Sequence, residues 1–252
     1  MATSIVPLTP ELLPALVRFC EATWQRPRTE AFYRWRYLEA PLQKGWLILR
    51  GEECIAMLLA FARPYRRGAE VVRFLEVHDW YALPSLKGAG LGVRLIRHAM
   101  SQPEPVLMVG GSDDSRELMP RLGYGAPATA KRFTLPVSGR ALAAALRKRV
   151  PATAPVAGVA GAAGVRTWFR PRRSDAPRGG RVLPVGRPGR ELESLYAEPG
   201  AYGTVALWPE EHLAWLVHGH AAAGLFVPLY FAVGDALRGF ALGRVVATSR
   251  GA

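Results

Sequence analysis

The hydrophobic pattern at the start of the chain is helical and then becomes alternating. Apolar residues recur every three or four positions over 10–20 and again over 30–38, which predicts two amphipathic helices after a short strand at 5–8. From Trp46 the period falls to two, and strand-like runs flank the turn Gly51-Glu52-Glu53. The change of period predicts two helices followed by a β-hairpin.

Strands and helices alternate in the next part of the chain. The segments predicted there are a long strand at 71–82, a helix at 91–99, a strand at 106–109, a helix at 113–122 and a closing strand at 132–135. The order of elements is then β-α-α-β-β-β-α-β-α-β, which indicates an α/β protein.

A glycine-rich corner joins the long strand to the helix after it. Gly88, Gly90 and Gly92 can adopt positive φ angles without a Cβ clash, so that successive N–H groups could converge on one oxyanion at the positive end of the helix. Lys87 adds a positive charge beside them. The spacing fits neither a dinucleotide-binding fingerprint nor a P-loop. The corner therefore favours a pyrophosphate site of another kind.

The run Pro84-x-x-Lys87-x-x-Gly90-x-Gly92 resembles the (Gln/Arg)-x-x-Gly-x-(Gly/Ala) signature of the GNAT superfamily of acyl-CoA N-acyltransferases. The order of elements supports the resemblance over residues 1–137, as does Leu122-Gly123-Tyr124, where the superfamily often has Gly-Phe. The resemblance implies a GNAT fold, a mixed and mostly antiparallel central sheet flanked by helices. Lys87 departs from the signature, because it keeps a charge but lacks the planar fork of arginine.

The resemblance also implies how a cosubstrate binds. Acetyl-CoA, or another acyl-CoA, would pair its pantetheine arm with the end of the long strand, and the corner would hold its pyrophosphate. The backbone N–H of Ala82 is expected near the thioester carbonyl. The residues expected to bind the cosubstrate are Ala82, Leu83, Lys87, Gly88, Ala89, Gly90, Leu91 and Gly92. No metal is expected.

Glu76 is the first candidate for the general base. It lies eleven residues before the lysine of the corner, where some members of the superfamily carry a catalytic glutamate. Side chains alternate along a strand, so we expect Glu76 and His78 to share one face, and Leu75, Val77 and Asp79 to share the other. A carboxylate inside an apolar sheet would have a raised pKa, which suits proton removal from an ammonium group.

Other interpretations of this strand remain open. His78 or Asp79 could be the base instead, or the reaction could proceed without a side-chain base. Glu76 could also be an ordinary sheet residue paired with Arg36 or Arg73.

The general acid and the acceptor contacts are less clearly marked. Many GNAT enzymes have a tyrosine four residues before the Gly-Phe pair, but Met119 stands there in this chain and cannot donate a proton. Ser112, Ser115 or water could take this role. By the resemblance, the first two helices line the acceptor pocket, so Tyr33 and Arg36 are expected to contact the substrate.

The second half of the chain partly repeats the first. Glu30-x-x-x-x-Trp35 aligns with Glu210-x-x-x-x-Trp215, and the first hairpin aligns with a hairpin-like run at 229–242. The repeat stops before a second glycine corner, and we expect its strand-like edge at 245–248 to be covered by the first domain or by a second copy of the chain. The expected parts are a GNAT domain at 1–137, a connector at 138–180 and an incomplete second GNAT-like domain at 181–252.

Composition adds a charge pattern and few other constraints. The 252 residues carry a formal net charge of +13, of which residues 140–181 contribute +9. We interpret this basic stretch as a solvated connector, which makes nucleic acid an unlikely partner. The 2 cysteines are interpreted as reduced core residues, and the lack of a leader or of a membrane-spanning run favours a cytoplasmic protein. His212, His218 and His220 are interpreted as a surface helix end and not as metal ligands.

These expectations converge on N-acyl transfer. The chain is expected to move an acetyl group from acetyl-CoA to a primary amine by direct attack in a ternary complex, because no cysteine lies where a covalent intermediate would need one. The acceptor is expected to be a small molecule or a peptide amine, and a homodimer is compatible with the fold. The alternatives are a noncatalytic GNAT-like module that binds CoA or a partner, and a protein that acts on nucleic acid through its basic connector.

Overall fold

The computed structural model describes residues 3–24, 28–108, 111–125, 179–184, 189–192, 195, 204–219 and 226–244. Met1–Leu118 and Arg181–Ala252 form one compact unit, and Met119–Gly180 form a second. The closing strand expected at 132–135, most of the connector and the edge at 245–248 lie outside the described residues. Those expectations, and the domain boundaries that depend on them, stay predictions.

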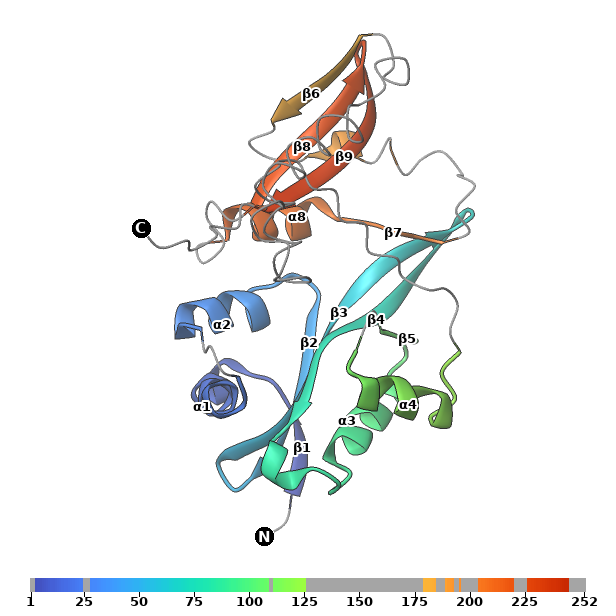
Figure 1. Ribbon diagram of the computed structural model, residues 1–252. Coiled ribbons are helices and arrows are strands. Elements are labelled where there is room, and N and C mark those ends of the chain that lie inside the picture. Colours follow the sequence, from blue (N-terminus) through green and yellow to red (C-terminus); the bar gives the residue numbers. More distant parts are fainter. Residues whose placement is uncertain are drawn as a thin grey trace, which may run out of the picture. The chain divides into compact units, whose positions relative to one another are not determined.

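The first unit contains a mostly antiparallel sheet in the order β1-β2-β3-β4-β5, with β7 alongside β3 (Figure 1). Its strands are β1 (Thr3–Pro7), β2 (Gln43–Arg50), β3 (Glu53–Arg67), β4 (Glu70–Ala82), β5 (Val106–Met108) and β7 (Val205–Ala206). Neighbours from β1 to β4 pair antiparallel, whereas β5 runs parallel to β4. The mixed, mostly antiparallel sheet of the GNAT fold is thus present.

Helices cover both faces of this sheet (Figure 1). One face carries α1 (Leu13–Thr23) and α2 (Glu30–Tyr37), and the other carries α3 (Leu91–Met100) and α4 (Asp113–Arg121). Short 3-10 turns, η1 (Pro10–Leu12) and η2 (Pro84–Leu86), precede α1 and the glycine corner. The helix positions agree with those expected from the apolar periodicity.

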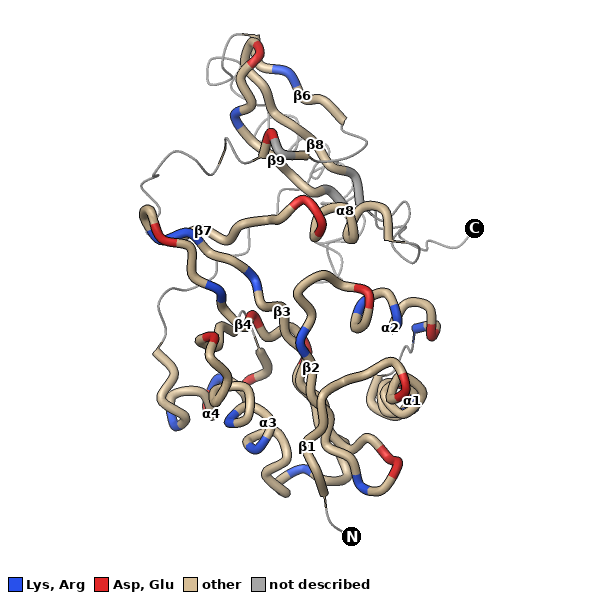
Figure 2. Tube along the Cα trace, turned by 180° about the vertical axis from the view of Figure 1, so that it is seen from behind, with Lys and Arg blue, Asp and Glu red and all other residues tan. Residues whose placement is uncertain are grey.

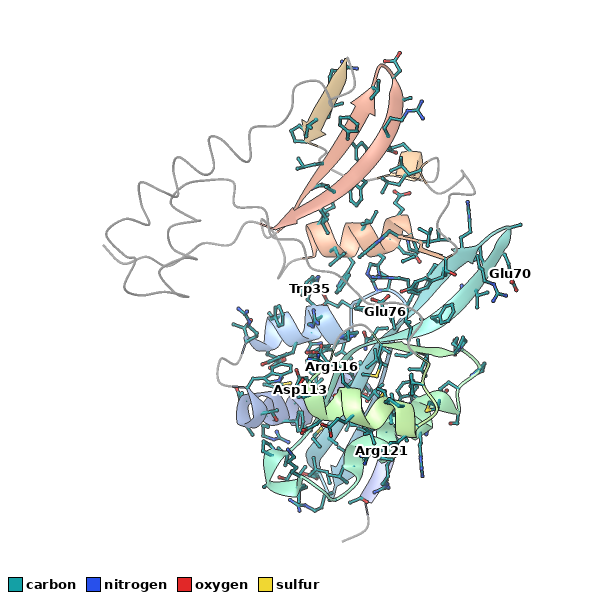
Figure 3. All side chains as sticks on the ribbon, turned by 45° about the vertical axis from the view of Figure 1, so that its right-hand side comes forward. Trp35, Glu70, Glu76, Asp113, Arg116 and Arg121 are labelled. Carbon is teal, nitrogen blue, oxygen red and sulfur yellow. The ribbon has the colours of Figure 1, made fainter. Side chains whose placement is uncertain are left out.

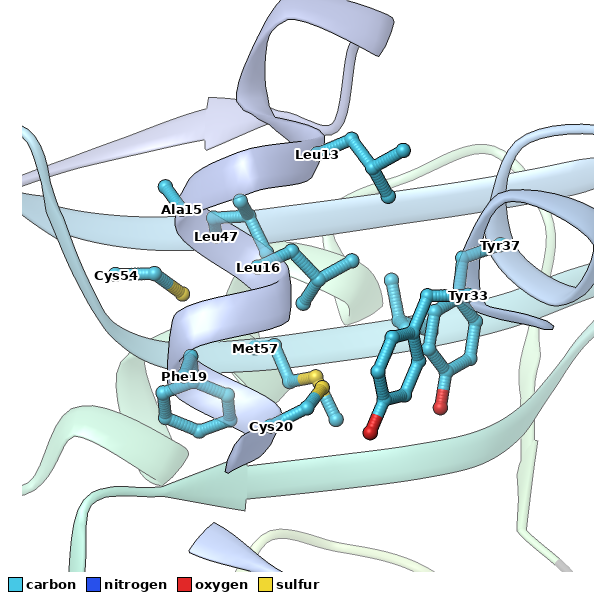
Figure 4. Close-up of a cluster of buried hydrophobic side chains, with 11 residues drawn as sticks. Leu13, Ala15, Leu16, Phe19, Cys20, Tyr33, Tyr37, Leu47, Cys54 and Met57 are labelled. Carbon is cyan, nitrogen blue, oxygen red and sulfur yellow. The ribbon is translucent and has the colours of Figure 1, made fainter. Parts of the chain in front are cut away.

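The core between α1, α2 and the sheet is apolar (Figure 4). Leu13, Leu16 and Cys20 of α1 pack with Met57 and Leu59 of β3, and each of these side chains is 0 % exposed. The α1 residues are three and four positions apart and the β3 residues are two apart, so each element presents one apolar side to the other. This packing fixes the helices that border the site described below.

A second sheet is formed by the C-terminal residues in the order β6-β8-β9. Its elements are β6 (Gly180–Pro184), η4 (Arg190–Leu192), α8 (Glu210–His218), β8 (Phe226–Val233) and β9 (Ala236–Arg244). The order has the same form as β1-β2-β3, and both hairpins turn at a glycine with positive φ, Gly51 at 63° and Gly234 at 60°. These likenesses support the expected duplication, which stays a prediction.

Candidate functional site

A β-bulge in β4 interrupts the alternation of its side chains. Two consecutive residues of β3 lie opposite Val77 and Asp79, so His78 is the extra residue between them. The contacts below place Asp79 on the same side of the sheet as Glu76 and His78, which is the side that α2 covers. The expectation that Asp79 shares a face with Val77 is therefore wrong, because the extra residue resets the period of two.

Glu76 is anchored from β3 through one of its two oxygens. Its Oε2 accepts a hydrogen bond from the Tyr65 hydroxyl at 2.8 Å and pairs with Nη1 of Arg63 at 2.9 Å. The Glu76 side chain is 18 % exposed, and no residue in the described part of the chain bonds to Oε1. Its partner is Arg63, and not Arg36 or Arg73. Glu76 is labelled in Figure 3. Oε2 therefore holds the carboxylate in place, while the lone pairs of Oε1 remain available to accept a proton.

His78 and Asp79 form a hydrogen-bonded pair beside Glu76. Nδ1 of His78 lies 2.8 Å from Oδ2 of Asp79. Burial lowers the pKa of His78, so the imidazole is neutral near pH 7, donates its Nδ1–H to Asp79 and keeps a lone pair on Nε2. Nε2 is buried and has no partner among the described residues. The ring lies between Phe61, at 4.3 Å between centroids, and Tyr37, at 6.1 Å.

Asp79 is a carboxylate that orients the ring of His78. Besides His78, its Oδ2 accepts a hydrogen bond from the Tyr37 hydroxyl at 3.1 Å and pairs with Nη2 of Arg36 at 3.0 Å. Burial opposes the charge on Asp79, but the bonds from His78 and Arg36 outweigh it and lower the pKa of Asp79. The lowered pKa makes Asp79 a weak base, so we interpret Asp79 as the group that fixes the ring of His78.

Of the two residues expected to contact an acceptor, only Arg36 lies at this cluster. Its side chain is 31 % exposed and pairs with Asp79. Tyr33 is 0 % exposed, and its hydroxyl accepts a hydrogen bond from the backbone N–H of Arg28 at 2.9 Å. The expectation for Tyr33 is therefore wrong, because it lies on the buried face of α2 and stacks on Tyr37.

The glycines of the corner have two different physical roles. Gly88 and Gly90 have φ angles of 90° and 72°, a region that side chains with a Cβ rarely adopt, and open space surrounds both. Gly92 packs closely, because a Cβ there would lie 3.3 Å from the indole of Trp80 and the ring would have to shift by a few tenths of an ångström. That indole also donates its Nε1–H to the Gly92 carbonyl at 3.1 Å, which ties α3 to β4.

Several backbone N–H groups of the corner point to no protein acceptor. Lys87 and Ala89 donate inward at 3.1 Å, to the carbonyls of Pro84 and Leu86. The N–H groups of Gly88 and of 90–92 have no acceptor in the part of the chain that the structure describes. Those of 91–92 belong to the first turn of α3, whose N–H groups no helix can satisfy internally. The corner therefore keeps an N–H cluster at a helix N-terminus, as an anion site requires.

The end of β4 has a free edge next to this cluster. β5 pairs with β4 only over 75–77, so the residues beyond have no neighbour on that side within the described chain. The Leu83 N–H donates to the Ile55 carbonyl at 3.0 Å, and the Leu83 carbonyl accepts from Leu86. Backbone groups alternate in direction, so the Ala82 N–H points away from β3, toward the free edge. Leu83 has neither group free, and we omit it from the proposed cosubstrate contacts.

Lys87 pairs with an acidic residue of α4. Its Nζ lies 2.9 Å from Oδ2 of Asp114, and both side chains are largely exposed. The hydrogen bond to Asp114 raises the pKa of Lys87. A pyrophosphate at the corner would therefore compete with Asp114 for the ammonium group.

Residues 9–104 match the model of the acetyltransferase (GNAT) family. These residues form a GNAT-family domain. The match spans α1 to the loop before β5, and so includes the bulge of β4 and the glycine corner. No curated protein matches the chain.

Solved structures resemble the GNAT domain at low identity. AAC(6')-Iy in complex with the bisubstrate analogue CoA-S-monomethyl-acetylneamine is 14 % identical, with 54 % of this chain and 99 % of that chain covered and a TM-score of 0.45. A transcriptional regulator from Bacillus halodurans C-125 is 13 % identical, with 53 % and 100 % covered and a TM-score of 0.45. Aminoglycoside 6'-N-acetyltransferase AAC(6')-IG from Acinetobacter haemolyticus is 23 % identical, with 54 % and 99 % covered and a TM-score of 0.40.

Residues outside the GNAT domain also reach this cluster, and the sequence analysis missed them. The Arg63 guanidinium lies 4.0 Å from the ring centroid of Trp208, and its Nη2 lies 3.5 Å from Nε2 of His212. His212 is 2 % exposed, so its interpretation as a surface residue is wrong. Arg63 itself was a usable signal, because it follows the apolar run 55–62 and a buried arginine needs partners.

Three further features of the described residues complete the description of the site. No group of three or more metal-ligating side chains occurs among them. No helix among them is long and apolar enough to cross a membrane. Cys20 and Cys54 are both buried and unpaired, as expected for core residues.

Proposed function

We propose that this protein is an N-acyltransferase that takes an acyl group from an acyl-CoA, with acetyl-CoA as the first choice, and transfers it to a primary amine. The observation that carries the proposal is the N-terminal cluster of α3. The N–H groups of Gly88 and of residues 90–92 have no acceptor in the described part of the chain, and they adjoin the free edge of β4 at Ala82. Both features lie within the GNAT-family domain. The cluster would bind the pyrophosphate, and the free edge would pair with the pantetheine arm.

The transfer itself needs a polarised carbonyl and a proton acceptor. In our proposal the Ala82 N–H polarises the thioester carbonyl while a neutral amine attacks its carbon, so that a C–N bond forms and the C–S bond breaks. Glu76 takes the proton of the attacking nitrogen through Oε1, the oxygen that Arg63 and Tyr65 leave free. The departing thiolate takes a proton from water or from a hydroxyl such as that of Ser112.

The cysteines support direct attack. Burial raises the pKa of Cys20 and raises that of Cys54 to about 12, so both thiols are protonated at neutral pH. Both are also buried in the core between α1 and the sheet. A chain with only 2 cysteines, neither of them nucleophilic, favours a ternary complex over an acyl-cysteine intermediate.

The alternative is a noncatalytic module that binds acyl-CoA. Met119 favours this alternative, because it stands where many GNAT enzymes have a tyrosine that acts as the general acid. Calorimetric titration with acetyl-CoA tests the binding step, and thiol release across a panel of small amines, amino sugars, aminoglycosides and peptides tests the transfer. We expect binding and amine-dependent thiol release. Binding without release would support the noncatalytic module, and the absence of binding would reject both.

A further inference from the structure

Arg63 is a charged side chain in an almost fully enclosed position. It is 8 % exposed and lies on β3, where the neighbouring residues toward the N-terminus are apolar. A buried guanidinium is costly unless its charge is paired and its environment is polarisable. The ion pair with Glu76 at 2.9 Å supplies the charge partner. Besides the Tyr65 hydroxyl, which shares Glu76 with it, the neighbours of Arg63 include Trp208 and His212 of the C-terminal segment.

The C-terminal segment is aligned on Arg63 by backbone pairing. β7 pairs with β3 in a fixed register, with Ala206 opposite Tyr65, and the Leu207 N–H donates to the Pro64 carbonyl at 2.9 Å. The next residue is Trp208, whose ring lies 4.0 Å from the guanidinium. One turn further, at the start of α8, His212 reaches the same group.

α8 is fixed independently at its other end. Trp215 stacks on Trp35 of α2 with ring centroids 4.8 Å apart, and Phe61 packs against Trp215 at 5.8 Å. The strand pairing of β7 and this stacking lie on either side of Trp208 and His212. Both residues are therefore held in place by contacts other than their own.

We propose that Trp208 and His212 are positioning residues for acyl transfer, which hold Arg63 so that it anchors Glu76 through Oε2 and leaves Oε1 aimed at the reacting amine. The proposal rests on the proposed function. It assigns part of the site to residues beyond 9–104, the range that matches the family. The C-terminal segment then completes the catalytic geometry of the GNAT domain.

The chemistry of the two side chains fits this role. A guanidinium stacked over an indole keeps its plane fixed while its edge remains free for a carboxylate. Burial, and next the charge of Arg63, lower the pKa of His212 to about 4, so the imidazole is neutral and does not repel Arg63 near pH 7. Nε of Arg63 has no partner among the described residues, so the stacking on Trp208 and the Nη contacts with Glu76 and His212 contribute to the orientation of the group.

The placement of Arg63 can be tested without any acceptor. In the full-length protein, the Nε–H signal of Arg63 should be shifted upfield by the ring current of Trp208, and both Trp208→Leu and Glu76→Gln should move it. Trp208→Phe keeps an aromatic face and should retain most of the shift. Trp46→Phe, which alters a buried indole of β2 that packs against His98 of α3, is the matched control and should leave the signal in place. An Arg63 signal that Trp208→Leu does not move would overturn the proposal.

The consequence for transfer is measured with an amine that the wild-type protein acetylates. Trp208→Leu should lower kcat roughly ten- to hundredfold, since small displacements of a catalytic group are costly, while the Kd for acetyl-CoA stays unchanged. Trp208→Phe should recover most of the activity. An equal loss of kcat in Trp46→Phe would indicate a general effect of losing a buried indole and would reject the positioning role.

Failure of this inference and failure of the proposed function give different results. In one case the wild-type protein shows the shifted Arg63 signal but neither binds acetyl-CoA nor releases thiol. That result would reject the acyltransferase assignment, and with it the catalytic role of the placement of Arg63. Normal turnover in Trp208→Leu would reject the positioning role alone.

Discussion

Trp35 and Trp215 hydrogen bond to each other reciprocally. The Trp35 indole donates to the Trp215 carbonyl at 3.2 Å, and the Trp215 indole donates to the Trp35 carbonyl at 2.9 Å. The two residues occupy the same place in the repeated pattern Glu-x-x-x-x-Trp of α2 and α8. A contact in which equivalent residues exchange equivalent bonds is typical of a two-fold interface. It is what we would expect where two copies of one ancestral unit face each other.

Replacing Trp215 by phenylalanine should destabilise the protein by about 1–3 kcal/mol. The variant keeps an aromatic ring but leaves the buried Trp35 carbonyl without its donor. Chemical denaturation measures the change in the free energy of unfolding. Trp80→Phe, which removes a comparable indole bond to the Gly92 carbonyl, is a control at the other end of the sheet. A Trp215→Phe variant as stable as the wild type would show that the reciprocal bonds contribute nothing.

Gly90→Asp should abolish acetyl-CoA binding. The new carboxylate would stand at the N-terminus of α3, where the open N–H groups favour an anion, and would repel the pyrophosphate. Gly90→Ala is the matched control, because it carries the same cost of a Cβ at a φ of 72° without a charge. Calorimetry should show weakened binding for alanine and none for aspartate. Equal affinities for the two variants would argue against an anion site at this corner.

Asp114→Asn should tighten acetyl-CoA binding a few fold. The substitution releases Lys87 from its ion pair and removes a negative charge close to the proposed pyrophosphate site. Because both side chains are exposed, the gain should shrink as salt is added. Titrations at low and high ionic strength measure this difference. A gain that is independent of salt, or a loss of affinity, would contradict the placement of the phosphates beside Lys87.

Glu76→Gln should lower kcat about 10²- to 10⁴-fold, the usual contribution of a general base. Glutamine can still accept from Tyr65 and Arg63, so the Kd for acetyl-CoA should be preserved, while the loss of the charge partner of Arg63 should lower the free energy of unfolding. His78→Gln should cost roughly tenfold or less, because Nε2 is enclosed between two rings. The reverse order of the two effects in single-turnover kinetics would make His78 the base.

The stability of the protein should fall as the pH is lowered from about 6.5 to about 4. The pKa of His212 is about 4 in the folded protein, whereas an unfolded histidine titrates near 6.5. In that range the unfolded chain binds the proton and the folded chain does not, so acid favours unfolding by up to roughly 3 kcal/mol. His78 contributes with the same sign, because its pKa is also lowered.

Urea denaturation between pH 4 and pH 7 measures this dependence. His212→Gln should flatten the slope, and His218→Gln, whose side chain is exposed, should leave it unchanged. A slope that both variants retain in full would mean that His212 is not buried in its neutral form.

Charges of both signs are interspersed over the described part of the first unit (Figure 2). At the candidate site the carboxylates of Glu76 and Asp79 are each paired with a positive charge: Glu76 pairs with Arg63, and Asp79 pairs with Arg36. The acidic side chains at this site are thus engaged by arginines. Acceptor recognition there cannot rest on a surplus of carboxylates alone.

The sequence by itself determined the helices and strands of the GNAT domain and the place of the glycines at its corner. The helices over 10–20 and 30–38 and the glycines before α3 are encoded in local spacing and in the φ angles that only glycine adopts readily, so neighbouring residues suffice to predict them. The tertiary structure decided the face of Asp79, the partner of Glu76 and the burial of Tyr33 and His212. Each of these depends on a strand register or on a contact between residues far apart in the chain, such as Trp208 over Arg63, and no local pattern encodes which distant segment will pair.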